Sequence, residues 1–365
     1  MNNRERTMAI LNYEKYDKMP VVHFGYWSQL VDKWVEEGHI TKEESAEHIV
    51  SEKLGFDYGW GAQYGGHNGL MPGFEWKILE ERPDGSKIQQ NGSGLIEEIK
   101  TGLTSIPSTV GTLMTGREAW EELYKPKLHP DKNRYGNPEQ LADVKKNMES
   151  LTDSPAGLMC GSLYGAIRDM LGVEGLCYLY ADDEDLYYKI IDTIGNLCYE
   201  VAKPILESGI KPDFLHFWED ICFKNGPLVN PAIFKEYVGP HYKKITDLGK
   251  KYGANFASLD CDGCIDKLVP IWLENGVNVM FPIEVGTWEA SIEPWRKEYG
   301  KELRGVGGMN KNIFALDFKA VDKEIERLRP LIDLGGFIPC PDHRIPPEAK
   351  WDNIRYYCDQ MRKIF

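Results

Sequence analysis

The sequence predicts an α/β protein, a single (β/α)8 TIM-barrel domain over residues 1–365. The first observation is an alternation, from about residue 157 onward, of short apolar runs with amphipathic stretches, which is typical of parallel strands joined by crossover helices. The second is that five or six such units follow one another, which fits a barrel enlarged by insertions. A doubly wound sheet is the alternative, but the sequence lacks the GxGxxG turn that would favour it.

The C-terminal two thirds of the chain carries the regular units. Short apolar runs are expected to form strands at residues 157–163, 214–217, 255–259, 277–281, 303–306 and 336–339. Stretches between and after them are expected to form helices at residues 183–208, 231–252, 265–274, 288–299, 317–334 and 347–364. The second of these helices opens at Pro231, a first-turn position where the missing N–H of proline costs nothing.

The N-terminal third is less regular. Residues 19–24 are expected to form the first barrel strand, and residues 27–37 and 42–54 to form two helices. Residues 60–116 are rich in Gly, Ser and Thr, with alternating stretches at 75–80 and 95–100, and residues 123–145 are polar. We therefore expect residues 60–145 to form an irregular, β-rich insertion that acts as a lid over the barrel mouth.

Charge and hydropathy restrict the partners. The net charge of −14 disfavours nucleic acid and anionic membrane surfaces, because phosphate groups repel such a protein at long range. No apolar run approaches the roughly 20 residues that span a bilayer, and the N-terminus lacks the apolar segment of a secretory signal. A cytoplasmic enzyme is expected, in which the eight scattered cysteines are reduced.

The candidate chemistry lies where barrel strands end, since active sites of barrels form at the C-terminal ends of their strands. Four of these ends carry carboxylates and one carries a histidine. These residues are Glu219 and Asp220, Asp260 and Asp262, Glu284, and Asp342 with His343. Several carboxylates in one mouth repel one another unless a cation, a proton or an arginine lies among them, and a divalent metal meets that need.

Each candidate also has a structural interpretation. Asp260 or Asp262 could cap the following helix, Glu219 could pair with Arg168 or Lys224, and Gly307-Gly308 could be a tight turn. A soft thiolate site is a further alternative, formed by Cys261, Cys264 and Cys340. However, adjacent strand residues face opposite ways, so Asp260 and Asp262 are expected to face inward while Cys261 packs against the helices.

At these residues the chain resembles the uroporphyrinogen decarboxylase superfamily, which includes corrinoid-dependent methyltransferases of the O-demethylase and methylcobamide methyltransferase types. The resemblance covers most of the chain and is strongest from about Asp213 onward. It is carried by residues 218–245, 259–285, 305–315 and 335–354. Decarboxylases of the superfamily carry arginines just after the first strand that clamp porphyrinogen carboxylates. Residues 20–34 contain no arginine, which disfavours porphyrinogen as the substrate.

The methyltransferases of this superfamily bind zinc through a His-x-Cys-Gly segment and a later cysteine. Their segment falls on Asp260-Cys261-Asp262-Gly263, and their later cysteine falls on or beside His343. The resemblance thus implies a zinc site, and we expect Asp262 and His343 to be ligands together with Asp260, Glu219 or Glu284. Such a set is harder than a thiolate site and suits coordination of an ether or hydroxyl oxygen.

The resemblance implies a methyltransferase that moves a methyl group between a small substrate, such as a methoxylated aromatic compound, and a partner corrinoid protein. Asp260, Asp262, Glu219 and His343 are then the catalytic candidates. Those for substrate binding are His23, Tyr26, Trp27, Trp60, Tyr64 and Asn310. The aromatic residues among them fit ordinary core packing equally well. The alternative function is a metal-independent decarboxylase or lyase acting on a small carboxylated substrate. A homodimer is expected by analogy alone.

Overall fold

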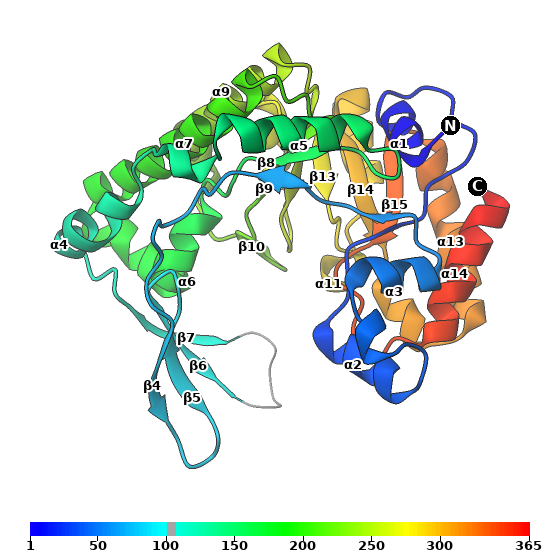
Figure 1. The fold of residues 1–365 in the computed structure, drawn as a ribbon, viewed down its shortest axis with the longest axis horizontal. Coiled ribbons are helices and arrows are strands. Elements are labelled where there is room, and N and C mark those ends of the chain that lie inside the picture. The colour runs from blue at the N-terminus through cyan, green and yellow to red at the C-terminus, as the bar shows by residue number, and fades with distance from the viewer. Residues whose placement is uncertain (101–106) are drawn as a thin grey trace.

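The core of the molecule is a parallel sheet (Figure 1), in a computed structural model that describes residues 1–100 and 107–365. Seven strands form one ladder, in the order β15-β14-β13-β12-β9-β8-β3, and every neighbouring pair is parallel. The strands are β3 (Tyr64–Gly65), β8 (Gly157–Met159), β9 (Phe214–Trp218), β12 (Phe256–Asp260), β13 (Val279–Phe281), β14 (Arg304–Met309) and β15 (Phe337–Pro341).

A second parallel pair lies next to β15 at one edge of this ladder. It consists of β1 (Val22–His23) and β2 (Tyr58–Gly59). On one side Ile345, just beyond β15, donates to the carbonyl of Gly25 at 3.0 Å, and Trp27 donates back to Ile345 at 3.2 Å. On the other side the chain runs from β2 directly into β3. The fold is therefore the predicted α/β barrel type.

The expected helices after the strands are present, with shorter ends. They are α2 (Ser28–Glu36), α3 (Glu47–Leu54), α7 (Glu184–Glu207), α9 (Gly239–Lys251), α10 (Val269–Glu274), α12 (Ile292–Tyr299), α13 (Phe318–Asp333) and α14 (Trp351–Ile364). The helix expected at residues 288–299 is broken, because Glu289 adopts a positive φ of 61° after the short helix α11 (Val285–Trp288). The helix expected from residue 231 begins as α8 (Pro231–Ile233) and passes through a π turn before α9.

Three helices of nine or more residues in the described chain were not predicted: α1 (Asn3–Leu11), α5 (Pro138–Ser150) and α6 (Gly165–Asp182). The signals for α5 were present, because Asn137 and Gln140 form a capping box and Pro138 occupies its first turn. These signals did not lead to a predicted helix, because the segment is mostly polar and only Leu141 and Met148 are buried in it. Helix α6 is interrupted at Gly172, which has a φ of 69°, so its apolar pattern lacks a continuous helical period.

The insertion contains a separate antiparallel sheet of four strands. They are β4 (Lys77–Glu81), β5 (Lys87–Gln90), β6 (Leu95–Ile99) and β7 (Ser108–Thr112), paired in chain order. Residues 101–106 belong to the expected insertion and lie outside the described residues. In Figure 1 the sheet projects from the α6 side of the barrel, across from α2 and α3.

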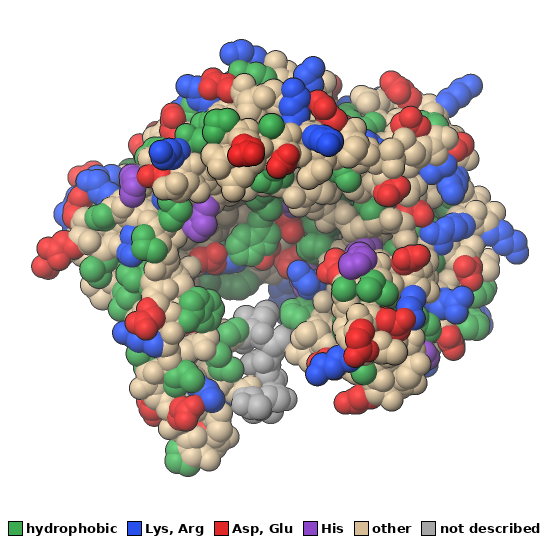
Figure 2. Space-filling model, in the orientation of Figure 1, with side chains coloured by type: hydrophobic (Ala, Val, Ile, Leu, Met, Phe, Trp, Pro, Cys, Tyr) green, Lys and Arg blue, Asp and Glu red, His purple; other side chains and the backbone are tan. Residues whose placement is uncertain are grey.

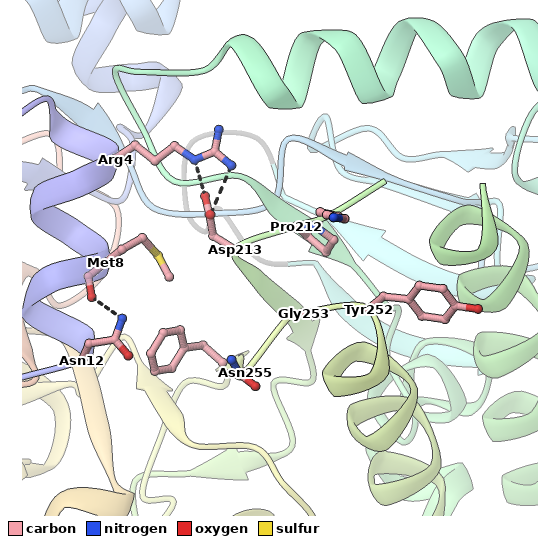
Figure 3. A pocket seen from close by; sticks show the side chains of 10 residues that line it. Arg4, Met8, Asn12, Pro212, Asp213, Tyr252, Gly253 and Asn255 are labelled. Atoms are coloured by element: carbon pink, nitrogen blue, oxygen red, sulfur yellow. Dashed lines mark hydrogen bonds and ion pairs between the residues drawn. The ribbon is translucent and has the colours of Figure 1, made fainter. Parts of the chain in front are cut away.

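The N-terminal end of the barrel is closed by α1 and by ion pairs (Figure 3). Arg4 in α1 binds Asp213, which precedes β9, through Nε at 2.8 Å and Nη2 at 3.2 Å, and it also donates to the carbonyls of Met148 and Leu151. A cavity of about 270 Å³ lies beside this pair. Because the carboxylate and the guanidinium are already paired, this end is a structural closure. None of the described helices has the length and apolarity needed to cross a membrane.

Candidate active site at the barrel mouth

The C-terminal strand ends open into a hollow between the β4–β7 sheet and helices α2 and α3. Figure 2 shows this hollow on the face in view, with acidic side chains at its floor. Both rims come from segments that follow early strands, whereas the floor is formed by the ends of later ones. The geometry thus places the mouth where barrel enzymes bind their substrates.

Three aspartates meet at the ends of β9 and β12. The side chains of Asp220, Asp260 and Asp262 each offer an oxygen, and these oxygens lie within 4.8 Å of one another. The backbone aligns them: Asp260 pairs with Trp218 in the ladder, and the N–H of Asp262 donates to Asp220 Oδ1 at 3.2 Å. Among the residues that the structure describes, this is the only group of three or more metal-capable side chains that converges.

His343 and Glu284 border this aspartate cluster. His343, two residues beyond β15, lies with Nε2 3.1 Å from Asp262 Oδ2. Glu284 follows β13 and accepts from the N–H of Gly263 at 2.6 Å and from the hydroxyl of Thr287 at 2.9 Å. The other oxygen of Asp262, Oδ1, is buried and has no hydrogen-bond partner among the described residues. A buried, unpartnered carboxylate oxygen is costly, so the cluster is incomplete without a ligand or a proton.

Burial and mutual repulsion raise the pKa values of several carboxyl groups in and beside the cluster. Burial and the charge of Asp262 raise the pKa of Asp220 to about 6. Burial, with the charges of Asp220 and Asp262, raises the pKa of Asp260 well above its ordinary value. The pKa of Glu284 is raised by burial and by Asp262. Burial opposes protonation of His343, but its hydrogen bond to Asp262 and the charge there leave its pKa raised. A divalent cation would relieve the repulsion among these carboxylates.

Basic residues partly balance these charges. The ammonium of Lys311 lies 3.4 Å from Asp342 Oδ1, whose side chain is fully buried. The guanidinium of Arg168 donates to the backbone carbonyl of Asp220 and lies over the ring of Trp218, 5.4 Å from its centroid. Both cations are therefore engaged with other partners, and neither forms an ion pair with the three aspartates.

Aromatic rings line the wall next to His343. The ring of Phe24 lies 4.4 Å from that of Phe281 and 5.6 Å from that of His343, measured between centroids. Trp27 lies 5.7 Å from His343 and is partly exposed. An aromatic wall beside a polar cluster suits a substrate with an apolar body and one polar end.

Glu219, expected as a ligand and catalytic residue, lies elsewhere. Its side chain is fully buried, and its two oxygens accept hydrogen bonds from several groups at the start of α6 and from α9. The donors are the N–H groups of Leu163, Tyr164 and Gly165 and the hydroxyls of Ser162 and Tyr242. We therefore correct its role: Glu219 caps the N-terminus of α6, where orphan N–H groups favour an anion.

His23 and Tyr26 also do not face the mouth. His23 accepts from the N–H of Gly25 through Nδ1 at 3.0 Å, and its Nε2 lies 3.0 Å from the hydroxyl of Ser51 in α3. The hydroxyl of Tyr26 lies 3.1 Å from the same serine. Both side chains pack between β1 and the helix outside it, whereas Phe24, between them in sequence, faces inward. Strand alternation explains the opposite faces of His23 and Phe24, and Gly25, with a positive φ of 86°, interrupts the alternation before Tyr26.

The remaining substrate candidates have structural partners. Trp60 is buried inside the barrel, where it stacks on Phe214 at 4.6 Å and donates to the hydroxyl of Ser258 at 3.1 Å. The hydroxyl of Tyr64 donates to the carbonyl of Tyr135 at 2.8 Å. The side chain of Asn310 accepts from the N–H of Asn312. Of the six residues expected to bind substrate, only Trp27 is beside the cluster.

The cysteines do not form the alternative thiolate site. Cys261 is buried on the opposite side of the chain from the aspartates, where its Sγ accepts from the N–H of Ile221 at 3.4 Å. Cys264 lies near Asp266, and Cys340 is fully buried in β15. Together these three do not converge as metal ligands among the described residues.

Asp220 belongs to the cluster, although the sequence pattern led us to assign only Asp260 and Asp262 of the three aspartates to the site. Alternation along β9 could have found it, because inward-facing His216 and Trp218 predict that residue 220 faces inward and residue 219 outward. The same argument had been applied to Asp260 and Asp262 but not to β9. Asp220 also has a φ of 48°, a rare conformation for a non-glycine residue.

Comparisons with known proteins support the fold. The chain is similar over its full length to the structure of a methyltransferase from Methanosarcina mazei, with 14% sequence identity and a TM-score of 0.58, covering 100% of this chain and 98% of that chain. It also aligns with a B12-independent methionine synthase from Shewanella sp. W3-18-1, solved in complex with selenomethionine, with 11% identity and a TM-score of 0.47 over 95% of this chain and 98% of that one. No protein-family model matches the sequence, and neither does any curated protein. The first likeness shows a shared fold.

Proposed function

We propose that this chain is a methyltransferase that moves a methyl group between a small, methoxylated aromatic substrate and a corrinoid carried by a partner protein, with zinc as a Lewis acid. The observation that carries the proposal is the cluster of Asp220, Asp260 and Asp262 beside His343 at the mouth of the barrel. The likeness in fold to a methyltransferase also supports the proposal of methyl transfer.

The residues of the cluster fit a divalent metal. Their oxygens approach within 4.8 Å, and Asp262 Oδ1 is buried without a partner. The 3.1 Å between His343 Nε2 and Asp262 Oδ2 is close to the roughly 3.3 Å that separates two ligands of one tetrahedral zinc ion with bonds near 2.0–2.1 Å. Three ligands drawn from the three aspartates and His343 would hold the metal and leave a fourth position for a substrate oxygen. Bound there, the metal would polarise an ether or hydroxyl oxygen of the substrate.

The protein itself would orient the substrate. Trp27, Phe24 and Phe281 present ring surfaces next to His343, where an aromatic substrate could pack. Glu284 holds the loop at Gly263 through its hydrogen bond and so fixes the backbone that carries Asp262. The partly exposed side of the cluster faces the open mouth, which leaves room for a large partner to approach.

Metal analysis tests the site directly. We expect about one zinc per chain in the wild type and less than about a tenth of that in Asp262→Ala and His343→Ala. Asp192→Ala is the matched control, because Asp192 pairs with His241 at 2.9 Å on the outside of the barrel. Equal zinc content in the control and the two site variants would contradict the metal assignment.

Methyl transfer is tested by mixing the zinc-loaded protein with cob(I)alamin and a panel of methoxylated aromatic compounds. The expected result is the absorbance of methylcob(III)alamin with at least one compound, lost in Asp262→Ala and retained in Asp192→Ala. No methylation of the corrinoid by any compound would refute the proposed reaction while leaving the metal site standing.

A metal-independent decarboxylase or lyase is the second candidate. It is favoured by the raised pKa of Asp260, since a carboxyl that keeps its proton can act as a general acid. The two functions differ in their response to chelators: removal of zinc should abolish methyl transfer but leave a metal-independent lyase active.

A further inference from the structure

A second pocket lies between the loop after β12 and helices α11 and α12. Its volume is about 520 Å³, within the range of small-molecule sites. It shares two chain segments with the aspartate cluster, because Asp266 follows Asp262 by four residues and Trp288 follows Glu284 by four. The lining residues are Asp266, Trp288, Glu289, Ala290, Ser291, Pro294, Trp295, Glu298 and Tyr299.

The charged residues of this pocket are all of one sign. Asp266, Glu289 and Glu298 are acidic, and no lysine, arginine or histidine is among the residues that line it. None of the three belongs to the converging metal-capable group found in the described part of the chain. The pocket therefore has a negative potential but not the ligand arrangement of a metal ion.

Aromatic side chains form another part of the pocket wall. Trp288 and Trp295 lie 6.1 Å apart between centroids, with their planes inclined at 40°, and Tyr299 lines the same space. Trp295 is only 5% exposed, and its Nε1 donates to Asp266 Oδ1 at 2.7 Å, which fixes the indole against a carboxylate. Ring faces attract cations through their quadrupole, most strongly when the ring is tryptophan.

These two properties together select one class of ligand. A bare metal ion needs converging oxygen ligands, and a neutral aromatic compound would not need three carboxylates. An alkylated ammonium ion has both a positive charge for the acidic groups and an apolar surface for the indole rings. We propose that this pocket binds a small organic ammonium cation, with Trp288 and Trp295 as the aromatic walls and Glu289 and Glu298 as the charge partners.

Calorimetric titration of the full-length protein with choline tests the proposal, with its neutral isostere 3,3-dimethylbutan-1-ol as the reference. We expect choline to bind at one site and the neutral alcohol to bind at least ten-fold more weakly, because only the charge differs. Binding should weaken with added sodium chloride, since the carboxylates are exposed and screened. Equal binding of the two compounds, or no binding of choline, would overturn the proposal.

Variants locate the binding. Trp288→Ala should weaken choline binding roughly two- to five-fold, the size of an exposed cation–π contact. The double variant Glu289→Gln/Glu298→Gln should weaken it similarly, and because both side chains are exposed it should fold normally. Trp76→Ala is the control for the loss of an exposed tryptophan elsewhere, since Trp76 is 65% exposed.

Asp262→Ala separates this pocket from the aspartate cluster. Choline binding should be unchanged in that variant. If Asp262→Ala abolishes it while Trp288→Ala and the double variant do not, the cation binds at the barrel mouth and the pocket assignment is wrong.

Discussion

Two neighbouring acidic residues at the end of β9 lie on opposite faces of the strand. Asp220 faces the barrel mouth and joins the metal-capable group, while Glu219 faces the helices and is fully occupied by donors from α6 and α9. The pleat of the strand makes this difference, because successive side chains point to opposite faces. At the scale of residues, whether a carboxylate reaches the barrel mouth therefore depends on which face of the strand its position occupies, and not on its amino-acid type.

Asp220→Asn should remove a metal ligand with little structural change, since the amide keeps the shape of the carboxyl group. We expect zinc affinity to fall at least about ten-fold, measured by competition with a chromogenic chelator. Asp192→Asn, which removes an exposed carboxylate, should keep wild-type affinity. Unchanged affinity in Asp220→Asn would remove this residue from the ligand set.

Buried neutral histidines should make stability fall in mild acid. Burial lowers the pKa of both His23 and His216 to about 4. Between pH 6.5 and about pH 4 these histidines are protonated in the unfolded chain but neutral in the folded chain. The free energy of unfolding therefore decreases as the pH falls through this range. Each histidine should contribute a loss of about 2 kcal/mol between pH 7.5 and pH 5.

The check is urea unfolding of the metal-free protein at both pH values. His216→Phe should lose about 2 kcal/mol less than the wild type over the same interval, because the phenyl ring does not titrate. His129→Gln, at an exposed position, should behave as the wild type. An identical pH dependence in His216→Phe and the wild type would show that His216 is protonated equally in the folded and unfolded states.

At the scale of elements, short strands deliver the functional groups and helix termini fix them. The cluster draws on residues at the end of β12 and just beyond β9, β12 and β15, while the first turn of α6 is tied to the end of β9 through Glu219. An anion at a helix N-terminus satisfies donors that the helix cannot satisfy itself. Helix α6 and the strand that carries Asp220 are thus held together by one buried carboxylate.

Glu219→Gln tests this link. The amide cannot accept from all the donors that meet the carboxylate, and hydrogen bonds to a charged group contribute about 1.5–3 kcal/mol each. We expect a loss of about 2–4 kcal/mol in the free energy of unfolding, measured in urea at pH 7.5. Glu184→Gln, in the first turn of α7, should change it by less than about 0.5 kcal/mol. A Glu219→Gln protein as stable as the wild type would contradict the capping role.

At the scale of the whole molecule, the barrel supplies the site and the insertion supplies one rim of the mouth (Figures 1 and 2). The β4–β7 sheet has its own ladder and packs against α6 through β6 and β7, where the hydroxyl of Thr112 donates to the carbonyl of Met170. Its two edge strands, β4 and β7, connect it to the barrel. The expected role as a lid stays a prediction.

Replacing residues 77–112 with a flexible linker of about eight residues tests that role, since three strand spacings separate the two ends by roughly 14 Å. We expect the barrel to fold and to keep its zinc, because the four assigned ligand candidates, Asp220, Asp260, Asp262 and His343, all lie outside the excised segment. Methyl transfer should slow at least ten-fold if the sheet encloses the substrate. Wild-type turnover in the shortened protein would show that the sheet has no part in the reaction.

The sequence alone predicts the barrel class, the barrel strands other than β2 and β3, and the strand ends that carry Asp260, Asp262 and His343. These follow from hydrophobic period and from residues adjacent to it, which are local properties of the chain. Only the tertiary structure decided which neighbours turn inward: Asp220 instead of Glu219, and Phe24 instead of His23 and Tyr26. It also revealed α1, α5 and α6, and the pairing of His343 with Asp262 across 81 positions of sequence. The physical reason is that short strands fix the face of a side chain only once their register with neighbouring strands and helices is set.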